Sequence, residues 1–174
     1  MNPDYKAYER YGNFIINRGG SLGSGNYGNV YRGYLIGPNQ TLEPVAIKEF
    51  TSHKSNINEI QTLQILNHPN IVRYIDYKVS GNSVFMVMEL CDGTLDDLLQ
   101  GMEVAEPDRL INIYGQVIRG IKFMHDKKIL HRDIKPQNLL VKRNTIKIAD
   151  FGTSKMNIGN ELRTLVGTPL FFSP

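Results

Sequence analysis

The sequence contains little that could cross-link the chain covalently or place it in a membrane. Its 174 residues include a single cysteine, Cys91, which excludes an intramolecular disulfide and favours a reducing compartment. Residues 1–10 are polar and charged and have no apolar core of the kind that signal peptides carry. No apolar run approaches the ~18 to 20 residues that span a bilayer. We therefore expect no membrane segment and a location in the cytoplasm or the nucleus.

A concentrated charge of either sign is also lacking. The 20 Lys and Arg residues and 17 Asp and Glu residues give a net charge of +3, spread along the chain. Nucleic-acid-binding domains carry a clustered basic stripe, so we expect no nucleic-acid partner. The hydrophobic fraction of 41% and charged fraction of 21% are typical of a folded globular chain. The length suffices for one domain with a core or for two small lobes.

The first half of the sequence has the pattern of a sheet with one helix. Residues 14–50 are rich in strand-forming residues, and 71–79 and 83–90 read as two further strands. Between them, apolar residues recur at helical spacing over 55–66, with Ser55 as a candidate N-cap.

The second half is led by a long helix. Asp92-Gly93 reads as a linker, the apolar spacing predicts a helix over 108–126, and short strands are expected near 138–142 and 145–149. The helix carries two apolar stripes, which consist of Leu110, Ile113, Val117, Ile121 and Met124 and of Ile111, Tyr114 and Ile118. A helix that is apolar over so much of its circumference is expected to be buried on several sides.

A glycine-rich segment lies near the N-terminus. Gly23, Gly25 and Gly28 have the spacing that lets backbone N–H groups approach phosphate oxygens. This spacing alone is weak evidence, since it also fits a surface loop or a dinucleotide-binding turn. A dinucleotide-binding turn opens into a helix, whereas here a strand pattern beginning at Val30 follows. The segment therefore predicts a hairpin turn over ATP rather than a site for NAD.

Lys48 and Glu59 form a candidate ion pair. Lys48 ends the apolar strand Val45-Ala46-Ile47, where a lysine alone would usually be a surface residue. Glu59 lies in the predicted helix over 55–66 and alone would usually face solvent. Taken together, they suit a cation for nucleotide phosphates that is held by a helix carboxylate.

Two motifs of the second half carry the chemistry of phosphoryl transfer. Transfer to an alcohol needs a carboxylate near the hydroxyl, oxygen ligands for Mg²⁺ and a cation near the transferred phosphate. In the segment 131–138, Asp133 supplies the carboxylate, Lys135 the cation and Asn138 an amide oxygen. Asp150, in Asp-Phe-Gly at the end of a predicted strand, supplies a second metal ligand.

These motifs, in this order, resemble the eukaryotic protein kinase family over roughly residues 14–174. The pattern Asp-x-Lys-Pro-x-Asn around Lys135 resembles the Ser/Thr type. The resemblance implies a two-lobe α+β fold, with an N-terminal extension over 1–13, a β-rich N-lobe with one regulatory helix over 14–91 and part of a C-lobe over 92–174. It also implies that ATP and Mg²⁺ are used and that a protein Ser or Thr hydroxyl accepts the γ-phosphate.

The resemblance assigns roles residue by residue. The nucleotide contacts it implies are Leu22, Gly23, Ser24, Gly25, Asn26, Tyr27, Gly28, Val30, Ala46, Lys48, Glu89, Cys91 and Leu140. The catalytic set it implies is Asp133 as the base with Lys135, Lys48 and Glu59, and the Mg²⁺ ligands are Asn138 and Asp150. Leu63, Tyr74, His131 and Phe151 resemble the stacked spine of an active kinase.

A regulatory site is implied beside the catalytic base. Arg132 can hold a phosphate of the activation segment and thereby fix its geometry. Thr164 is the favoured acceptor of that phosphate, from an upstream kinase, and Ser154 is less favoured; the alternative for Thr164 is an ordinary loop hydroxyl. Thr168 is expected to hydrogen-bond the catalytic loop near the substrate.

Two features depart from the family pattern. The segment after the hinge is one Gly shorter than the common form, which leaves the ribose contact open among Asp92, Thr94 and Asp96. The family continues beyond Pro174 with further C-lobe helices, so the resemblance implies a C-lobe that is cut short just before the end of the activation segment. We accordingly expect the second stripe of the helix over 108–126 to have no partner.

Three functions compete for these motifs. A Ser/Thr protein kinase fits all the motifs, and an ATP-binding regulatory or inactive fragment is the alternative because the later C-lobe is absent from the sequence. A dinucleotide-dependent oxidoreductase is disfavoured by the strand after Gly28. The subfamily stays open, since residues 164–174 resemble autophagy-initiating, NIMA-related and Ste20-like kinases alike.

Overall fold

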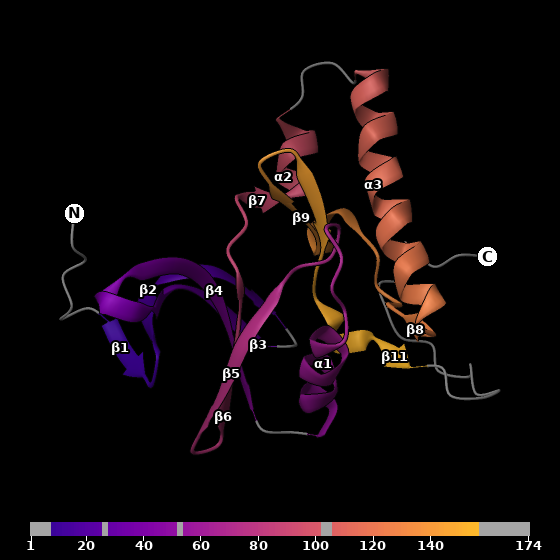
Figure 1. Ribbon diagram of the computed structural model, residues 1–174. Helices are drawn as coiled ribbons and strands as arrows, with labels where there is room; N and C mark the ends of the chain where they lie inside the picture. The colour runs from indigo at the N-terminus through magenta and orange to yellow at the C-terminus, as the bar shows by residue number, and fades with distance from the viewer. Residues whose placement is uncertain (1–7, 26–27, 52–53, 102–105, 157–174) are drawn as a thin grey trace. The chain divides into compact units, whose positions relative to one another are not determined.

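The computed structural model describes residues 8–25, 28–51, 54–101 and 106–156 (Figure 1). These residues fall into two compact units. The sheet unit contains the described residues up to Ile60 together with Tyr74–Leu90. The helical unit contains Gln61–Arg73 and the described residues from Cys91 onward.

The sheet unit is built on six antiparallel strands in the order β1-β2-β3-β4-β6-β5 (Figure 1). The strands are β1 (Tyr8–Tyr11), β2 (Phe14–Gly25), β3 (Gly28–Ile36), β4 (Leu42–Thr51), β5 (Tyr74–Ser80) and β6 (Ser83–Glu89). A 3₁₀ turn, Pro38–Gln40, joins β3 to β4, and α1 (Lys54–Gln64) follows β4. The predicted strands and the predicted helix over 55–66 are therefore confirmed. Because α1 already begins at Lys54, Ser55 lies inside the helix, and its assignment as the N-cap was wrong.

The core of this unit explains how the sheet presents Lys48. Phe14, Ile16, Val45, Ile47, Phe85 and Val87 form one buried cluster. Successive side chains of a strand point to opposite faces. In β4, Val45 and Ile47 therefore point into this cluster, whereas Ala46 and Lys48 share the other face of the sheet.

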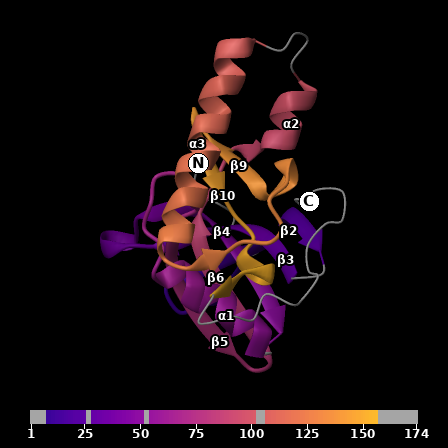
Figure 2. The same ribbon diagram turned by 90° about the vertical axis from the view of Figure 1, so that its right-hand side faces the viewer.

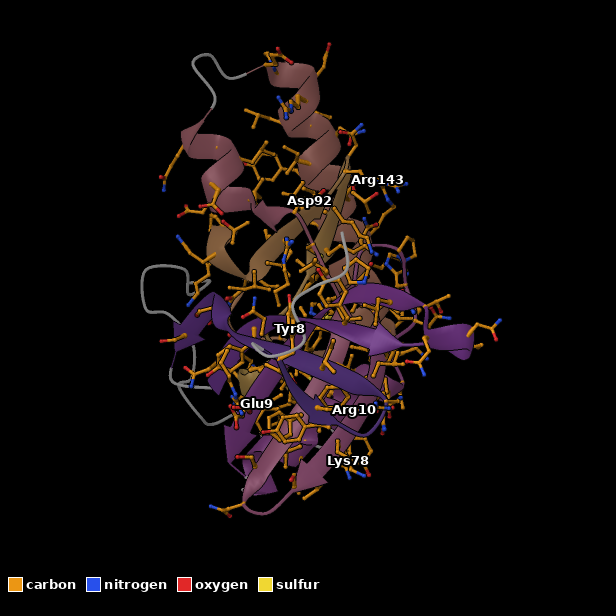
Figure 3. All side chains as sticks on the ribbon, turned by 90° about the vertical axis from the view of Figure 1, so that its left-hand side faces the viewer. Tyr8, Glu9, Arg10, Lys78, Asp92 and Arg143 are labelled. Carbon is orange, nitrogen blue, oxygen red and sulfur yellow. The ribbon has the colours of Figure 1, made fainter. Side chains whose placement is uncertain are left out.

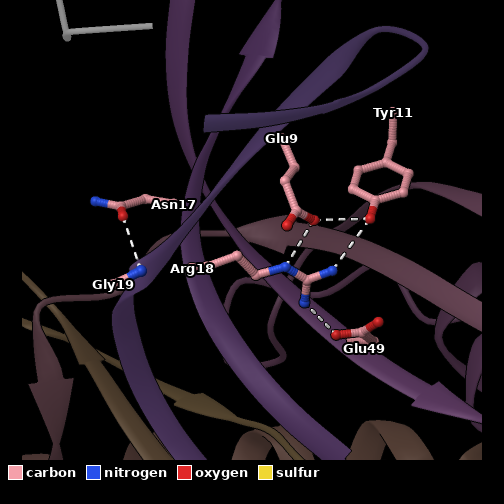
Figure 4. Close-up of polar contacts among 6 residues, drawn as sticks. All are labelled: Glu9, Tyr11, Asn17, Arg18, Gly19 and Glu49. Atoms are coloured by element: carbon pink, nitrogen blue, oxygen red, sulfur yellow. Dashed lines mark hydrogen bonds and ion pairs between the residues drawn. The ribbon is translucent and has the colours of Figure 1, made fainter. Parts of the chain in front are cut away.

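Strand β1 was not predicted, and one arginine of β2 ties it to the sheet (Figure 4). Arg18 donates to Glu9 at 2.8 Å and to the hydroxyl of Tyr11 at 3.1 Å, and it also pairs with Glu49 of β4. The hydrogen bond from Arg18 lowers the pKa of the Glu9 carboxyl. The Tyr11 ring lies 4.2 Å from that of Phe85. A strand of four residues gives little periodic signal, and these contacts come from residues distant in sequence.

The helical unit combines two helices with small sheets (Figure 2). Its elements are β7 (Gly93–Thr94), α2 (Leu95–Gln100), α3 (Pro107–Asp126), β8 (Ile129–Leu130), β9 (Leu139–Lys142), β10 (Thr145–Ile148) and β11 (Lys155–Met156), with 3₁₀ turns at Pro136–Asn138 and Phe151–Thr153. The strands pair in the orders β10-β9-β7 and β11-β8. The predicted helix over 108–126 and both predicted short strands are confirmed.

The two stripes of α3 have different environments. Ile113, Val117 and Met124 of the first stripe are buried. Ile111, Tyr114 and Ile118 of the second stripe are 68%, 63% and 64% exposed. Within the part of the chain that the structure describes, the second stripe faces solvent.

Helix α2 corrects the linker assignment at Asp92-Gly93. Gly93–Thr94 instead form β7, which pairs with β9, and Thr94 then caps α2. The Thr94 hydroxyl accepts a hydrogen bond from the Asp97 N–H, and the Asp97 carboxylate accepts one from the Thr94 N–H, both at 3.0 Å. The signal was Thr-x-x-Asp before an apolar run, which marks a helix start. None of the described helices combines the length and apolarity needed to cross a membrane.

Candidate active site

A buried ion pair lies in the sheet unit. The Nζ of Lys48 lies 2.8 Å and 2.9 Å from the two carboxylate oxygens of Glu59 on α1. Only 6% of the Lys48 side chain and 3% of the Glu59 side chain are exposed. The structure therefore brings this predicted pair together. A buried pair is expensive to desolvate, so its geometry indicates that this lysine is held for a purpose besides stability.

The glycine-rich segment is a β-hairpin, as predicted. Gly25 of β2 pairs with Gly28 of β3. Gly28 has a φ of +118°, and a Cβ there would lie 2.3 Å from the carbonyl oxygen of Glu49, so only glycine fits. A Cβ on Gly23 would meet nothing within 4 Å. The fold therefore does not require glycine at position 23, which suits the close approach of a ligand.

The other predicted nucleotide contacts of this unit have varied environments. Leu22 and Ser24 are exposed, Val30 is half-buried, and Ala46 and Glu89 are buried. Asn26 and Tyr27 lie outside the described residues.

A matched pair of substitutions separates the two glycines. We expect Gly28→Ala to lower the free energy of unfolding by about 1 to 3 kcal/mol, because the new Cβ meets backbone and the φ is strained. Gly23→Ala should leave that free energy within about 0.5 kcal/mol, because its surroundings are open. Urea denaturation measures both. Equal losses would show that the space around Gly23 is not as open as the structure indicates.

The catalytic loop of the helical unit orients Asp133. The Asp133 carboxylate accepts a hydrogen bond from Asn138 Nδ2 at 2.9 Å and lies 3.0 Å from Lys135 Nζ. Asn138 Nδ2 also donates to the Asp133 carbonyl oxygen at 2.8 Å. Asp133 is 6% exposed. The three predicted residues therefore meet in one hydrogen-bonded cluster around a single carboxylate.

The buried ring of His131 joins the catalytic loop to the residue that precedes Asp150. Its Nδ1 accepts a hydrogen bond from the Asp133 N–H at 3.3 Å, so its Nε2 carries the proton and donates to the Ala149 carbonyl at 2.9 Å. Burial lowers the pKa of His131, which keeps the ring neutral. The ring packs edge-on against Phe151 at 4.9 Å. Of the predicted spine, Leu63, His131 and Phe151 are buried.

The two predicted metal ligands have geometry suited to a cation. Asn138 Nδ2 donates to both the carbonyl oxygen and the carboxylate of Asp133, which fixes the orientation of the amide whose Oδ1 is the predicted metal ligand. Asp150 has a φ of +61°, a left-handed conformation that is costly for a residue other than glycine. Backbone strain of this kind clusters at functional sites. The described residues contain no group of three or more His, Cys, Asp or Glu that could hold a metal by themselves.

Arg132 also has a left-handed backbone, with a φ of +67°. Its Nε donates to the Thr153 carbonyl at 2.7 Å, and the Thr153 hydroxyl donates to the His131 carbonyl at 2.9 Å. Thr153 thus joins the segment after Asp150 to the catalytic loop, although no motif in the sequence had singled it out. Thr164 and Thr168 lie outside the described residues.

The segment after the hinge uses its polar groups for structure. The Asp92 carboxylate accepts a hydrogen bond from the Arg143 N–H at 2.5 Å, and both residues are labelled in Figure 3. The Asp92 N–H donates to the Val141 carbonyl at 2.7 Å. Thr94 caps α2, and Asp96 accepts a hydrogen bond from Gln100 at 3.1 Å. All three candidates for a ribose contact therefore already have structural partners.

The remaining two predicted nucleotide contacts, Cys91 and Leu140, are half-buried.

Comparison with known proteins identifies one family. The family model described as "Protein kinase domain" matches residues 16–174.

Several curated proteins are similar to most of this chain. Cytokinesis protein sepH of Emericella nidulans is 34% identical over 163 residues, which cover 90% of this chain and 12% of that protein. Serine/threonine-protein kinase Nek5 of Mus musculus is 36% identical over 165 residues, which cover 88% of this chain and 26% of that protein. MAP kinase kinase kinase wis4 of Schizosaccharomyces pombe is 33% identical over an alignment of 200 residues, which covers 99% of this chain and 14% of that protein. The chain thus spans about an eighth of the length of sepH.

Proposed function

The chain belongs to the protein kinase family, and we propose that it transfers the γ-phosphate of ATP to a Ser or Thr hydroxyl of a protein substrate. The observation that carries this proposal is the carboxylate of Asp133, buried and held by both Asn138 and Lys135. Its α+β fold, with a strand-rich unit and a helix-led unit, agrees with the family. The name of Nek5 includes the Ser/Thr class.

Asp133 would orient the acceptor hydroxyl and accept its proton. Its fixed position matters because phosphoryl transfer depends mainly on positioning and on electrostatic stabilisation. Lys135, 3.0 Å from the carboxylate and a quarter exposed at its side chain, can reach a phosphate oxygen and neutralise charge that develops during transfer. The neutral ring of His131 adds no competing charge behind the loop.

Each unit contributes its own predicted nucleotide contacts. In the sheet unit, Lys48, held by Glu59, would bind the α- and β-phosphates, and the hairpin containing Gly23 would cover them through backbone N–H groups. The family resemblance assigns an adenine contact to Ala46 in the sheet unit and to Leu140 in the helical unit. We do not assign the ribose to Asp92 or Thr94, because both are already engaged within the helical unit.

Magnesium fits the donor set. Mg²⁺ is usually held by one or two carboxylates together with substrate phosphates rather than by a cage of protein ligands. The carboxylate of Asp150 and the Oδ1 of Asn138 supply two hard oxygen donors of the right kind. When bound, the ion would neutralise charge on the transferred phosphate. Asp150 and Asn138 would orient the nucleotide through it.

Regulation would act beside the catalytic loop. We propose that an upstream kinase phosphorylates Thr164 and that Arg132 receives the phosphate, since Arg132 adjoins the catalytic Asp133. A cytoplasmic or nuclear location stays a prediction.

Nucleotide binding and phosphate transfer together test this function. We expect the chain to bind ATP in the presence of magnesium and Asp150→Asn to weaken that binding at least about tenfold. Asparagine tolerates the left-handed backbone of residue 150, so the turn should persist. In EDTA, the ATP affinities of wild type and Asp150→Asn should become equal. Asp126→Asn, which lies at the exposed end of α3, is the control and should bind ATP as wild type does. Calorimetry measures each affinity.

The same protein is then assayed for transfer of labelled γ-phosphate to Ser, Thr and Tyr peptides. If magnesium changes the ATP affinity of neither wild type nor Asp150→Asn, the assignment of Asp150 as a metal ligand is contradicted. Binding without transfer to any peptide would favour the alternative, an ATP-binding regulatory or inactive fragment.

A further inference from the structure

The buried side chain of Gln116 on α3 uses its entire hydrogen-bonding capacity. Its Oε1 accepts from the Ile146 N–H at 2.8 Å and from Asn70 Nδ2 at 3.1 Å. Its Nε2 donates to Asn112 Oδ1 at 2.8 Å and to the Asn144 carbonyl at 3.1 Å. Gln116 is 8% exposed and Asn70 is 4% exposed. A buried amide with two acceptor and two donor bonds is fully satisfied and fixed in one orientation.

Gln116 and Asn70 complete the free edge of a strand. In the sheet order β10-β9-β7, β10 pairs with β9 on one side only. On its other side, the Ile146 N–H donates to Gln116 and the Ile146 carbonyl accepts from Asn70 Nδ2 at 3.0 Å. Two side-chain amides therefore stand where the backbone of a neighbouring strand would be. Loss of either would leave buried backbone groups without partners.

The same edge is held further along by backbone. The Ile148 N–H donates to the Asn70 carbonyl, and the Val72 N–H donates to the Ile148 carbonyl, both at 2.9 Å. Helix α3 packs directly on this contact, since a Cβ on Gly120 would lie 2.7 Å from Ile148 Cδ1 and 3.0 Å from the Asn70 carbonyl oxygen. The position of β10 is thus set by α3 and the segment around Asn70.

Strand β10 leads straight to the candidate metal ligands. Ala149, which follows the strand, donates its N–H to the carbonyl of Asn138 at 2.9 Å, and its own carbonyl accepts from His131. Asp150 is the next residue. A displacement of β10 along or away from α3 would therefore move Asp150 relative to Asn138 through a short, bonded path.

We propose that Gln116 is a positioning residue that sets the spacing between Asp150 and Asn138 and thereby the affinity for the metal–nucleotide complex. The proposal rests on the proposed function, because it concerns the same metal ligands. Gln116 touches neither nucleotide nor metal, and it acts through Ile146 and β10. Partners of metal ligands commonly change metal affinity about 10- to 100-fold when they are removed.

The test uses three variants of the whole chain. Gln116→Met keeps the length of the side chain and removes all four hydrogen bonds. Gln116→Glu keeps both acceptor bonds, to Ile146 and Asn70, and serves as the conservative rescue. Val117→Ala, at a neighbouring buried position of α3 outside this network, is the control for a general loss of stability. Far-UV circular dichroism sets a temperature at which every variant is folded.

The first measurement is the affinity for Mn²⁺ in the presence of ADP, read by electron paramagnetic resonance. We expect Gln116→Met to weaken it about tenfold or more, Gln116→Glu to recover most of the loss, and Val117→Ala to match wild type despite a lower unfolding temperature. Affinity for ADP without metal should be equal in all four proteins. Equal Mn²⁺ affinity in Gln116→Met and wild type, or equal weakening in Val117→Ala, would overturn the proposal.

The second measurement needs no ligand. Hydrogen exchange at the amides of Ile146, Ile148 and Ala149 should accelerate in Gln116→Met, and less in Gln116→Glu. Unchanged exchange there would show that Gln116 does not hold β10, whatever the protein does with nucleotides. Failure of wild type to bind Mn²⁺ with ADP, together with accelerated exchange, would instead reject the proposed function and with it the role of Gln116 toward the metal. If Gln116→Met does not fold, Asn112→Ala takes its place, because it removes the Oδ1 that holds Gln116 Nε2 and lies at an exposed position of α3. Weaker Mn²⁺ binding or faster exchange in Asn112→Ala than in Val117→Ala supports the proposal, and identity with wild type overturns it.

Discussion

Replacement of Asp133 by asparagine is expected to lower the turnover of phosphoryl transfer about 10²- to 10⁴-fold while ATP affinity stays within about twofold of wild type. Asparagine offers no carboxylate to accept the proton of the acceptor hydroxyl. It keeps the shape of the side chain, and its Oδ1 can still accept hydrogen bonds from Asn138 and Lys135. The loop should therefore hold its position. The loss should appear in the chemical step and not in nucleotide binding.

Single-turnover transfer of labelled phosphate, with calorimetric ATP affinity, separates these effects. Asp126→Asn is the matched control, because it makes the same change at an exposed carboxylate that pairs with Lys122. The control should retain wild-type turnover. An Asp133→Asn protein that keeps more than about a tenth of the wild-type rate would remove Asp133 from the role of base.

The sequence made the elements that carry long repeating patterns predictable. Helix α3 matches its predicted bounds almost residue for residue, because apolar residues recur through five turns. Its two stripes were also visible in the sequence. The structure adds what α3 packs against, namely β10 and the segment around Asn70, which is far away in the chain.

Short elements escaped prediction because contacts between distant residues stabilise them. Strand β1 has four residues and depends on Arg18 and Phe85. Helix α2 has six residues, too few for periodicity, and only its capping pair Thr94 and Asp97 gave a local signal.

The site divides in a similar way. Asp133, Lys135 and Asn138 are close in sequence and their cluster was predictable, since a short loop can bring them together. The pairing of Lys48 with Glu59 was also predictable, because an apolar strand that ends in a lysine is followed by a helix that carries a carboxylate. The hydrogen bond between the side-chain amides of Gln116 and Asn70 joins residues that are 46 positions apart. No motif in the sequence distinguishes such a glutamine from any other polar residue on a helix.

Lys48 is expected to show two separable effects, one on stability and one on transfer. Lys48→Met leaves the Glu59 carboxylate buried without its cation, with 3% of that side chain exposed. Removal of one partner of a buried pair costs about 3 to 5 kcal/mol, because a charge then stays buried without compensation. The free energy of unfolding should fall by that amount. Urea denaturation measures the loss, and Glu59→Gln, which keeps an acceptor for Lys48 Nζ, should lose less.

The double variant Lys48→Met, Glu59→Leu separates stability from chemistry. Apolar replacement of both members of a buried pair is often neutral or stabilising, so the free energy of unfolding should return near that of wild type. Transfer of phosphate should not return, and should stay at least about 10²-fold below wild type, since the cation proposed for the α- and β-phosphates is lost. A stable double variant with near-wild-type transfer would show that Lys48 and Glu59 serve the fold alone. An inactive and unstable one would show that the surrounding core does not accept apolar side chains, and that the charge pair is itself part of the packing.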